Sequence, residues 1–344
     1  MRNLFAYAQL VRLPNTFTAW ADILLGAVAS GFLTLRCRWF AGKFEDMLPG
    51  SEGSELPGFS SEAAKWAIFV CLLAASTCFY WSGMVWNDYF DLDVDRKERP
   101  SRPIASERVS VRMALMLGVG LMAAGLGLTA CADLLSEEGR WRSLPVAVAL
   151  VGCIFLYDGM LKDTIFGPIA MGLCRSLNIF LGLTVVNAFP PPWGWVLALV
   201  VGVYIAGVTW FARSEAQQSN KTSLIAAAIV ILVSMFLALT VPALAIEPGA
   251  SVNPAGSTQP PVVYQPSILF PYLLALFGGY LGIAVLQAIN RPEPERVQKA
   301  VRRAILGLIV LDALLASAFV GMPGLLLAAL LLPGMILGRW FYST

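Results

Sequence analysis

Hydrophobic and polar positions alternate along this chain in long blocks. Apolar runs of about twenty residues, each long enough to cross roughly 30 Å of hydrocarbon, are separated by polar segments. Because a backbone in lipid has to satisfy its own polar groups, each run is predicted to form a helix. The pattern therefore predicts an all-α polytopic membrane protein with nine to ten transmembrane helices. The predicted spans are residues 16–35, 64–87, 112–134, 144–157, 167–187, 193–212, 222–245, 267–289, 301–319 and 324–341.

The breaks between these spans are mostly short turns. The Gly321-Met-Pro-Gly324 sequence separates the last two spans, so that 324–341 is predicted as a tenth. Two polar segments are longer, residues 36–62 and 247–266, and their Gly, Ser and Pro content is typical of flexible loops. Neither carries a catalytic pattern, and we expect both on one face of the membrane. Residues 1–344 are thus expected to form a single transmembrane domain.

Composition supports the membrane assignment and excludes several kinds of chemistry. Hydrophobic residues make up 58% of the chain and charged residues 13%, with a mean hydropathy of +0.70. Soluble proteins carry about a quarter charged residues. The start of the chain lacks the pattern of a cleaved signal peptide, so the first span is expected to serve as its own insertion signal. No histidine is present, which excludes imidazole bases and histidine-ligated haem or zinc. The six cysteines show no metal-type spacing and are expected to be buried thiols.

Lysine and arginine are distributed unevenly between the two sides. The loops after the even-numbered spans hold eleven of them, against five after the odd-numbered spans. Because positively charged loops stay in the cytoplasm, we expect the even loops and the N-terminus to face the cytoplasm.

The segment after the second span concentrates the charge. Asp88, Asp91 and Asp95 are spaced three and four residues apart, which predicts that they share one face of a helix. Such a face suits Mg²⁺, which is usually held by one or two carboxylates together with waters and a substrate phosphate. Asp93 lies off this face and is expected to play a supporting part. The alternative is a solvated helix end whose carboxylates pair with the basic residues that follow.

The same segment resembles a known family. The sequence Asn87-Asp88-Tyr-Phe-Asp91-Leu-Asp-Val-Asp95, followed by Arg99-Pro-Ser-Arg102-Pro, is similar to the first signature of UbiA-type membrane prenyltransferases. In that family the signature follows the second span on the cytoplasmic face, where the charge distribution independently predicts it.

Two flanking segments extend the resemblance. Arg12-Leu-Pro-Asn15, entering the first span, is similar to the Arg-Pro-x-Asn pattern of the family. Tyr157-Asp158-Gly-Met-Leu-Lys162 resembles a Tyr-Pro-x-x-Lys-Arg loop, with Asp158 where proline is usual and Asp163 in place of the second basic residue. The order of spans and motifs agrees over roughly residues 10–320.

The resemblance implies a helical bundle around a lipid-facing cavity and an Mg²⁺-dependent reaction. A polyprenyl diphosphate would lose its diphosphate and be joined to an aromatic or other lipophilic acceptor. The predicted catalytic residues are Asp88, Asp91, Asp95 and Lys162, with the three aspartates as ligands of Mg²⁺. The predicted substrate-binding residues are Asn15, Asn87, Arg102, Tyr157, Arg175, Asn178, Arg213 and Glu215. Nearby aromatic rings could stabilise an allylic cation or simply belong to the membrane interface. They are Tyr89, Phe90, Phe155, Tyr157 and Trp210.

Charged residues inside the spans add a second candidate cluster. Arg175 lies about two turns into the fifth span, with Asn178 one turn further on, and a charge at that depth is costly unless it faces a polar cavity. Asp22 lies on the same stripe of the first span as Asn15. Arg175 either faces the cavity or extends its side chain towards the interface, and a structural ion pair between Asp22 and Arg175 is equally consistent.

The loop after the sixth span departs from the family. A second aspartate-rich motif is usual there, yet residues 209–221 contain no aspartate. Glu215 could hold a metal, with Gln217 or Asn220 offering neutral oxygen atoms. Arg213 could instead replace the charge of a metal, because a guanidinium grips phosphate through two parallel hydrogen bonds.

These residues bear on four possible functions. The first is the prenyltransferase, with membrane lipid as its surroundings and no nucleic acid partner. The second is a non-catalytic relative that binds or transports an isoprenoid or lipid-like product, which the altered second motif favours. A phospholipid-type transferase is disfavoured because Asp158-Gly-Met-Leu-Lys does not match the signature of that class, and no inverted repeat supports an ion-coupled transporter. We expect location in a bacterial inner membrane, and the oligomeric state stays open.

Overall fold

The structure, a computed structural model, describes residues 2–33, 62–136, 141–186, 192–213, 220–245 and 267–341. All regular elements within these ranges are helical. They are α1 (Arg2–Leu10), η1 (Leu13–Asn15), α2 (Thr16–Ala29), α4 (Glu62–Phe90), α5 (Leu92–Glu98), α6 (Val111–Leu134), α7 (Ser143–Leu156), η2 (Tyr157–Leu161), α8 (Gly167–Leu183), α9 (Pro192–Arg213), α10 (Lys221–Ala245), α11 (Phe270–Asn290), α12 (Pro294–Val320), η3 (Met322–Leu330) and α13 (Leu331–Phe341).

The helices account for the spans expected from the sequence. Within the described ranges, eight helical segments are long and apolar enough to cross a membrane, and α8 is a shorter apolar helix. The predicted fourth span, which looked short, is extended by the π-helical turn η2, so that Ser143–Leu161 forms one segment of 19 residues. Helix α2 ends at Ala29, before the predicted end of the first span, and the predicted residues from 34 lie outside the described ranges. The chain is an all-α integral membrane protein, as predicted.

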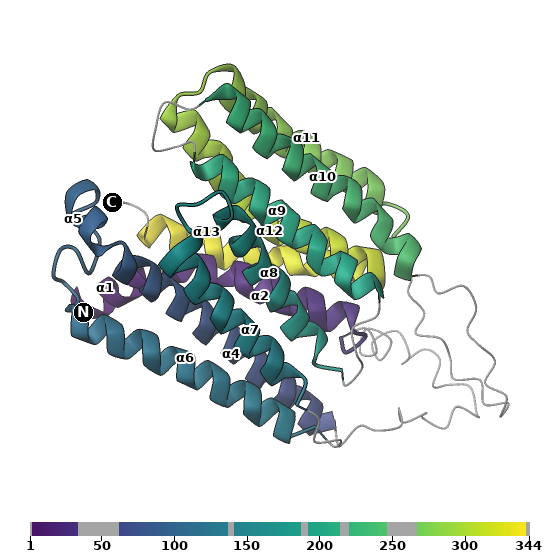
Figure 1. The fold of residues 1–344 in the computed structure, drawn as a ribbon. Coiled ribbons are helices and arrows are strands. Elements are labelled where there is room, and N and C mark those ends of the chain that lie inside the picture. The colour runs from purple at the N-terminus through teal and green to yellow at the C-terminus, as the bar shows by residue number, and fades with distance from the viewer. Residues whose placement is uncertain are drawn as a thin grey trace, which may run out of the picture.

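Helix α2 lies at the centre of the bundle. It packs against α4, α8 and α12, and its residues contribute to two hydrophobic clusters, one towards α4, α6 and α7 and the other towards α9 to α12. Figure 1 shows α6 on one side of the bundle and α10 with α11 on the opposite side. Helix α1 and the end of α13 lie at the end of the molecule that carries α5 (Figure 1).

The last membrane-spanning segment, formed by η3 and α13, begins by running back along α12. Gly321 has φ 71° and ψ −152°, a conformation that favours glycine. Three residues later, a Cβ on Gly324 would lie 2.4 Å from the backbone nitrogen of Ser317, so η3 folds directly back on the end of α12. The break predicted at these glycines is therefore a tight helical hairpin.

Helices α2 and α8 approach closely at two small residues. A Cβ on Gly26 would lie 2.6 Å from the carbonyl oxygen of Ile179, and one on Gly182 would lie 2.6 Å from the carbonyl oxygen of Ile23. Small residues at such crossings let two backbones pack against each other in a membrane. This contact fixes the position of α8, and hence of Arg175, relative to α2.

We expect Gly26→Ala to destabilise the protein by about 1–3 kcal/mol, because the added methyl group overlaps backbone atoms that cannot move aside. Gly120→Ala on α6 is the matched control, since a Cβ there meets no atom within 4 Å. The measurement is the thermal unfolding midpoint of both variants in detergent. Equal midpoints would contradict the close α2–α8 contact.

Candidate active site

The aspartate segment sits where α4 ends and α5 begins. Asp88 belongs to the last turn of α4, Asp91 precedes α5, and Asp95 lies within α5. The spacing predicted one helix through the three aspartates, and the structure instead has a break at Asp91. Backbone bonds from Asp91 N to Asn87 O (3.1 Å) and from Asp95 N to Asp91 O (2.8 Å) nevertheless keep a helical step across the break. The three aspartates consequently still point to one side.

Arg102 lies at the point where these aspartates converge. Its Nη1 atom is 3.2 Å from Oδ1 of Asp88, 3.9 Å from Oδ2 of Asp91 and 2.7 Å from Oδ2 of Asp95. Residues after α5 bring it there, because backbone turns such as Ser106 N to Arg102 O (2.9 Å) fold the segment before α6. A single cationic atom thus touches all three carboxylates, and charge-assisted contacts of this kind are the strong ones.

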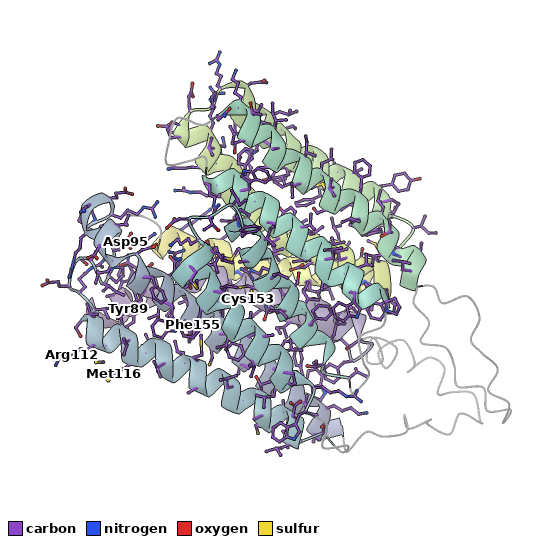
Figure 2. The ribbon with its side chains drawn as sticks, viewed as in Figure 1. Tyr89, Asp95, Arg112, Met116, Cys153 and Phe155 are labelled. Carbon is purple, nitrogen blue, oxygen red and sulfur yellow. The ribbon has the colours of Figure 1, made fainter. Side chains whose placement is uncertain are left out.

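Asp93 is excluded from this group. Its side chain is 93% exposed and pairs only on the surface, with Nη1 of Arg96 at 3.5 Å. The prediction that Asp93 lies off the shared face is confirmed. Figure 2 shows Asp95 at the end of the molecule that carries α5, with Tyr89 close below it.

Lys162 reaches the cluster from the other side. The turn η2 directs it there, since the backbone N–H of Lys162 donates to the carbonyl oxygen of Tyr157 at 2.9 Å. Its Nζ donates to Oδ2 of Asp91. π-helical turns are rare and often occur at functional sites, because they re-aim a side chain. The structure therefore brings together residues 71 positions apart that were both predicted to be catalytic.

Two members of the cluster were not predicted as site residues. Arg12 donates from Nη2 to Oδ1 of Asp88 (3.2 Å) and to Oδ1 of Asn87 (3.3 Å), and its backbone adopts a left-handed conformation with φ 49°. That strain is of order 1–3 kcal/mol, and the surrounding contacts hold it in place. Asp158 is buried and accepts from Nδ2 of Asn87 at 3.0 Å. Both lie inside the two motifs that flank the aspartate signature. The residues predicted to bind substrate in those motifs were Asn15 and Tyr157.

Aromatic rings line the apolar side of the aspartates. Trp86 lies at their centre, with ring centroids 5.0 Å from Phe155, 5.6 Å from Tyr89 and 5.9 Å from Phe90. The indole Nε1 of Trp86 has no hydrogen-bond partner among the described residues. Figure 2 shows Phe155 and Tyr89 on this side of the bundle. Tyr89, Phe90 and Phe155 were predicted to lie near the motif, and Trp86 was missed because it reads as part of an apolar span.

The intramembrane cluster forms a separate buried network. Arg175 Nη1 donates to Oδ2 of Asp22 at 3.0 Å, and its Nη2 donates to Oγ1 of Thr18 at 2.9 Å. Asn178 Nδ2 donates to the same Asp22 oxygen at 3.0 Å, while its Oδ1 accepts from Ser76 at 2.7 Å. This geometry favours the structural ion pair over extension of Arg175 to the interface.

Asp312 of α12 extends this network and was also missed. It is fully buried and interacts with the side chains of Asp22 and Arg175. The signal was present in the sequence, since Asp312 is an acidic residue inside a predicted span.

The remaining predicted residues lie apart from the aspartates. Arg213 donates from Nη1 to the carbonyl oxygen of Thr164, so it packs on the segment that follows Lys162. The side chain of Asn15 makes no hydrogen bond to another described residue, and its carbonyl accepts from Thr18 Oγ1 at 2.7 Å. Trp210 donates to Oγ of Ser223 at 3.1 Å. Glu215 and Gln217 lie outside the described residues, so the interpretation of that loop stays a prediction.

The aspartate cluster contains oxygen atoms of the kind that bind a metal ion. Within the described ranges, no group of three or more acidic, cysteine or histidine side chains is arranged to hold a metal ion. The three aspartates nevertheless converge on one positively charged atom of Arg102. Their oxygen atoms are the donors that Mg²⁺ prefers, so the donor set fits this ion, and in this structure Arg102 stands between the three carboxylates.

Several known proteins are similar to this chain in sequence. The model of the UbiA prenyltransferase family matches residues 59–306. A digeranylgeranylglyceryl phosphate synthase of Saccharolobus solfataricus is 29% identical over 180 residues, 52% of this chain and 51% of that one. A 4-hydroxybenzoate octaprenyltransferase of Pseudomonas fluorescens is 32% identical over 130 residues, 37% of this chain and 40% of that one. The chain thus spans about half, or less, of the length of these curated relatives.

The fold has solved counterparts. The structure of a UbiA homologue from Archaeoglobus fulgidus bound to GPP and Mg²⁺ superposes with a TM-score of 0.55, covering 94% of this chain and 99% of that one at 15% identity. At that identity the likeness concerns the fold alone.

Proposed function

The chain belongs to the UbiA prenyltransferase family, and on that basis we propose that it transfers a polyprenyl group from an allylic diphosphate to an aromatic or other lipophilic acceptor in an Mg²⁺-dependent reaction. The observation that carries this proposal is the convergence of Asp88, Asp91 and Asp95 on Nη1 of Arg102, with Lys162 on Asp91. These charged side chains lie at one end of an apolar helical bundle. A prenyl diphosphate likewise joins a charged group to a hydrocarbon chain.

The reaction makes a defined demand on these residues. The bond between the allylic carbon and the diphosphate oxygen breaks, and its electron pair leaves with the diphosphate. The acceptor then bonds to the allylic carbon and releases a proton. Because negative charge develops on the leaving group, preorganised positive charge lowers the barrier. Arg12, Arg102 and Lys162 are the cations that the fold brings to this point.

The balance of charge explains why a metal would be needed. Four carboxylates, those of Asp88, Asp91, Asp95 and Asp158, face three basic side chains in this cluster. A diphosphate added without further positive charge would be repelled. In this proposal Asp88, Asp91 and Asp95 would hold Mg²⁺, and the ion would supply positive charge for the leaving diphosphate. Arg102 and Lys162 bind diphosphate oxygen atoms.

Four aromatic side chains lie near the place where the allylic cation would form. Trp86, Tyr89, Phe90 and Phe155 pack against one another next to the aspartate segment. A ring face attracts a positive charge by about 0.5–2 kcal/mol, so in this proposal these rings would stabilise the allylic cation.

We assign the aspartate cluster to the cytoplasmic side of a bacterial inner membrane. The support is the excess of lysine and arginine in the loops at this end, eleven against five, and charged loops of this sign are retained in the cytoplasm.

The decisive experiment is pyrophosphate release by the purified protein in lipid. Geranyl, farnesyl and geranylgeranyl diphosphate are each supplied with pooled lipophilic acceptors, with Mg²⁺ or with EDTA. We expect release that needs both Mg²⁺ and an acceptor, and a loss of at least about 100-fold in EDTA.

Two other outcomes are informative. Saturable binding of the prenyl diphosphate without release would favour the non-catalytic carrier, which the missing aspartates of residues 209–221 also suggest. Full activity in Glu215→Ala would exclude that residue as a metal ligand.

A further inference from the structure

A cavity lies between α11, α12 and α13. Its volume is about 530 Å³, within the range of small-molecule sites. None of its lining residues is Asp88, Asp91, Asp95 or Lys162, and none lies in α4, α5 or η2. Figure 1 shows α11 on the side of the bundle opposite α6, and α12 and α13 nearer its middle.

The mouth of this cavity is basic. Lys299, Arg302 and Arg303 line it from the first turns of α12, together with Glu295. Among the described residues, neither Lys299 nor Arg302 makes an ion pair or hydrogen bond, and Arg303 stacks over the Tyr280 ring at 5.3 Å. Three cations against one carboxylate leave an excess of positive charge without a partner from these parts of the chain.

The deeper wall of the cavity is apolar. Leu306 and Val310 follow the basic residues along the same side of α12, and Leu331 and Met335 of α13 complete the wall. The spacing 299, 302, 306, 310 is that of one helix face, so charge gives way to hydrocarbon over about two turns. The cavity therefore has a cationic end and a hydrocarbon end.

The change from basic to apolar residues along α12 runs in the direction expected from the surface of a membrane to its interior. Helix α12 begins at the end of the molecule that carries the lysine- and arginine-rich loops, and its apolar part runs into the membrane. Basic pockets between transmembrane helices on the cytoplasmic side are suited to anionic lipid head groups. A free phosphate would use the mouth and leave the apolar wall empty.

We infer that this cavity binds one anionic membrane lipid, with its phosphodiester head group on Lys299 and Arg302 and an acyl chain along Leu306, Val310 and Met335. The lipid would bridge α12 and the last membrane-spanning helix, α13. This site is separate from the proposed catalytic one and does not depend on the activity of the protein.

Native mass spectrometry of the full chain in detergent tests this inference. The probes are palmitoyl-oleoyl phosphatidylglycerol and the zwitterionic phosphatidylcholine with the same chains. We expect one saturable phosphatidylglycerol adduct, bound at least 10-fold more tightly than phosphatidylcholine. In Lys299→Ala/Arg302→Ala its affinity should fall about 30-fold, because each removed charge contributes roughly 1 kcal/mol near an anionic head group.

A matched control removes the same charge outside the cavity. Arg291→Ala/Arg296→Ala also deletes two cations near the start of α12, and Arg296 pairs with Glu293 at 2.8 Å. Phosphatidylglycerol affinity should be unchanged in this pair, unchanged in the conservative Lys299→Arg/Arg302→Lys pair, and reduced in Val310→Trp, which fills the apolar wall.

Three results would overturn the inference. An equal loss of affinity in both alanine pairs would mean that the lipid responds to surface charge alone. Displacement of phosphatidylglycerol by 10 mM inorganic phosphate would mean a simple anion site. Displacement by geranylgeranyl diphosphate in Asp88→Ala would mean that the cavity takes the prenyl substrate. Prenyl transfer by the lipid-deficient variant is measured separately, so failure of this inference and failure of the proposed function are distinguishable.

Discussion

Replacing Asp91 with asparagine is expected to lower kcat/KM for prenyl transfer by about 10²–10³-fold. The Asp91 carboxylate accepts from Lys162 Nζ and lies 3.9 Å from Nη1 of Arg102, so it joins the two basic side chains proposed to bind the diphosphate. Asparagine keeps the shape of the side chain and removes its charge, and loss of one group that stabilises transition-state charge typically costs this much. Pyrophosphate release at saturating and limiting prenyl diphosphate measures the effect.

Asp93→Asn is the control for this prediction. It lies two residues away and removes the same charge, yet its side chain is 93% exposed and contacts only Arg96. We expect activity within about twofold of the unchanged protein, because exposed ion pairs contribute little. Similar losses in Asp91→Asn and Asp93→Asn would show that the net charge of the segment matters and that the convergence of Asp88, Asp91 and Asp95 does not.

Replacing Arg175 with methionine is expected to destabilise the protein by about 3–5 kcal/mol. This change leaves the carboxylate of Asp22 fully buried without its cation, and breaking a buried pair from one side carries a cost of this size. Methionine retains much of the packing volume of the arginine stem, so the loss reports on charge. The measurement is the unfolding midpoint in detergent together with the fraction of protein that stays monodisperse.

A double variant separates a structural role of Arg175 from substrate binding. Asp22→Leu combined with Arg175→Met removes both members of the pair, and replacing a buried ion pair by apolar residues is often neutral. We expect this protein to regain most of the lost stability. Recovered stability with KM for the prenyl diphosphate unchanged would assign Arg175 to the fold, whereas a KM still raised at least 10-fold would assign it to the substrate.

The contacts within the intramembrane network could not be predicted from the sequence. Asp22, Arg175 and Asn178 were expected near one another, because each is a polar residue inside an apolar span. Their actual contacts depend on the close crossing of α2 and α8 at Gly26 and Gly182. A rotation of either helix about its axis would keep the hydrophobic pattern and remove the ion pair.

The hydrophobic pattern by itself determined which segments cross the membrane, because in hydrocarbon each backbone has to satisfy its own hydrogen bonds locally. The three–four spacing likewise determined that Asp88, Asp91 and Asp95 point to one side even across the break at Asp91. Only the tertiary structure decided what meets them. Arg102 belongs to the same segment, and the sequence left its pairing with the aspartates open as one alternative. Arg12 and Asp158 come from separate segments, and Asp312 reaches Asp22 from the far end of the chain. The physical reason is that helix packing depends on the shapes of surfaces brought together from distant parts of the chain, and hydropathy carries no information about which of them meet.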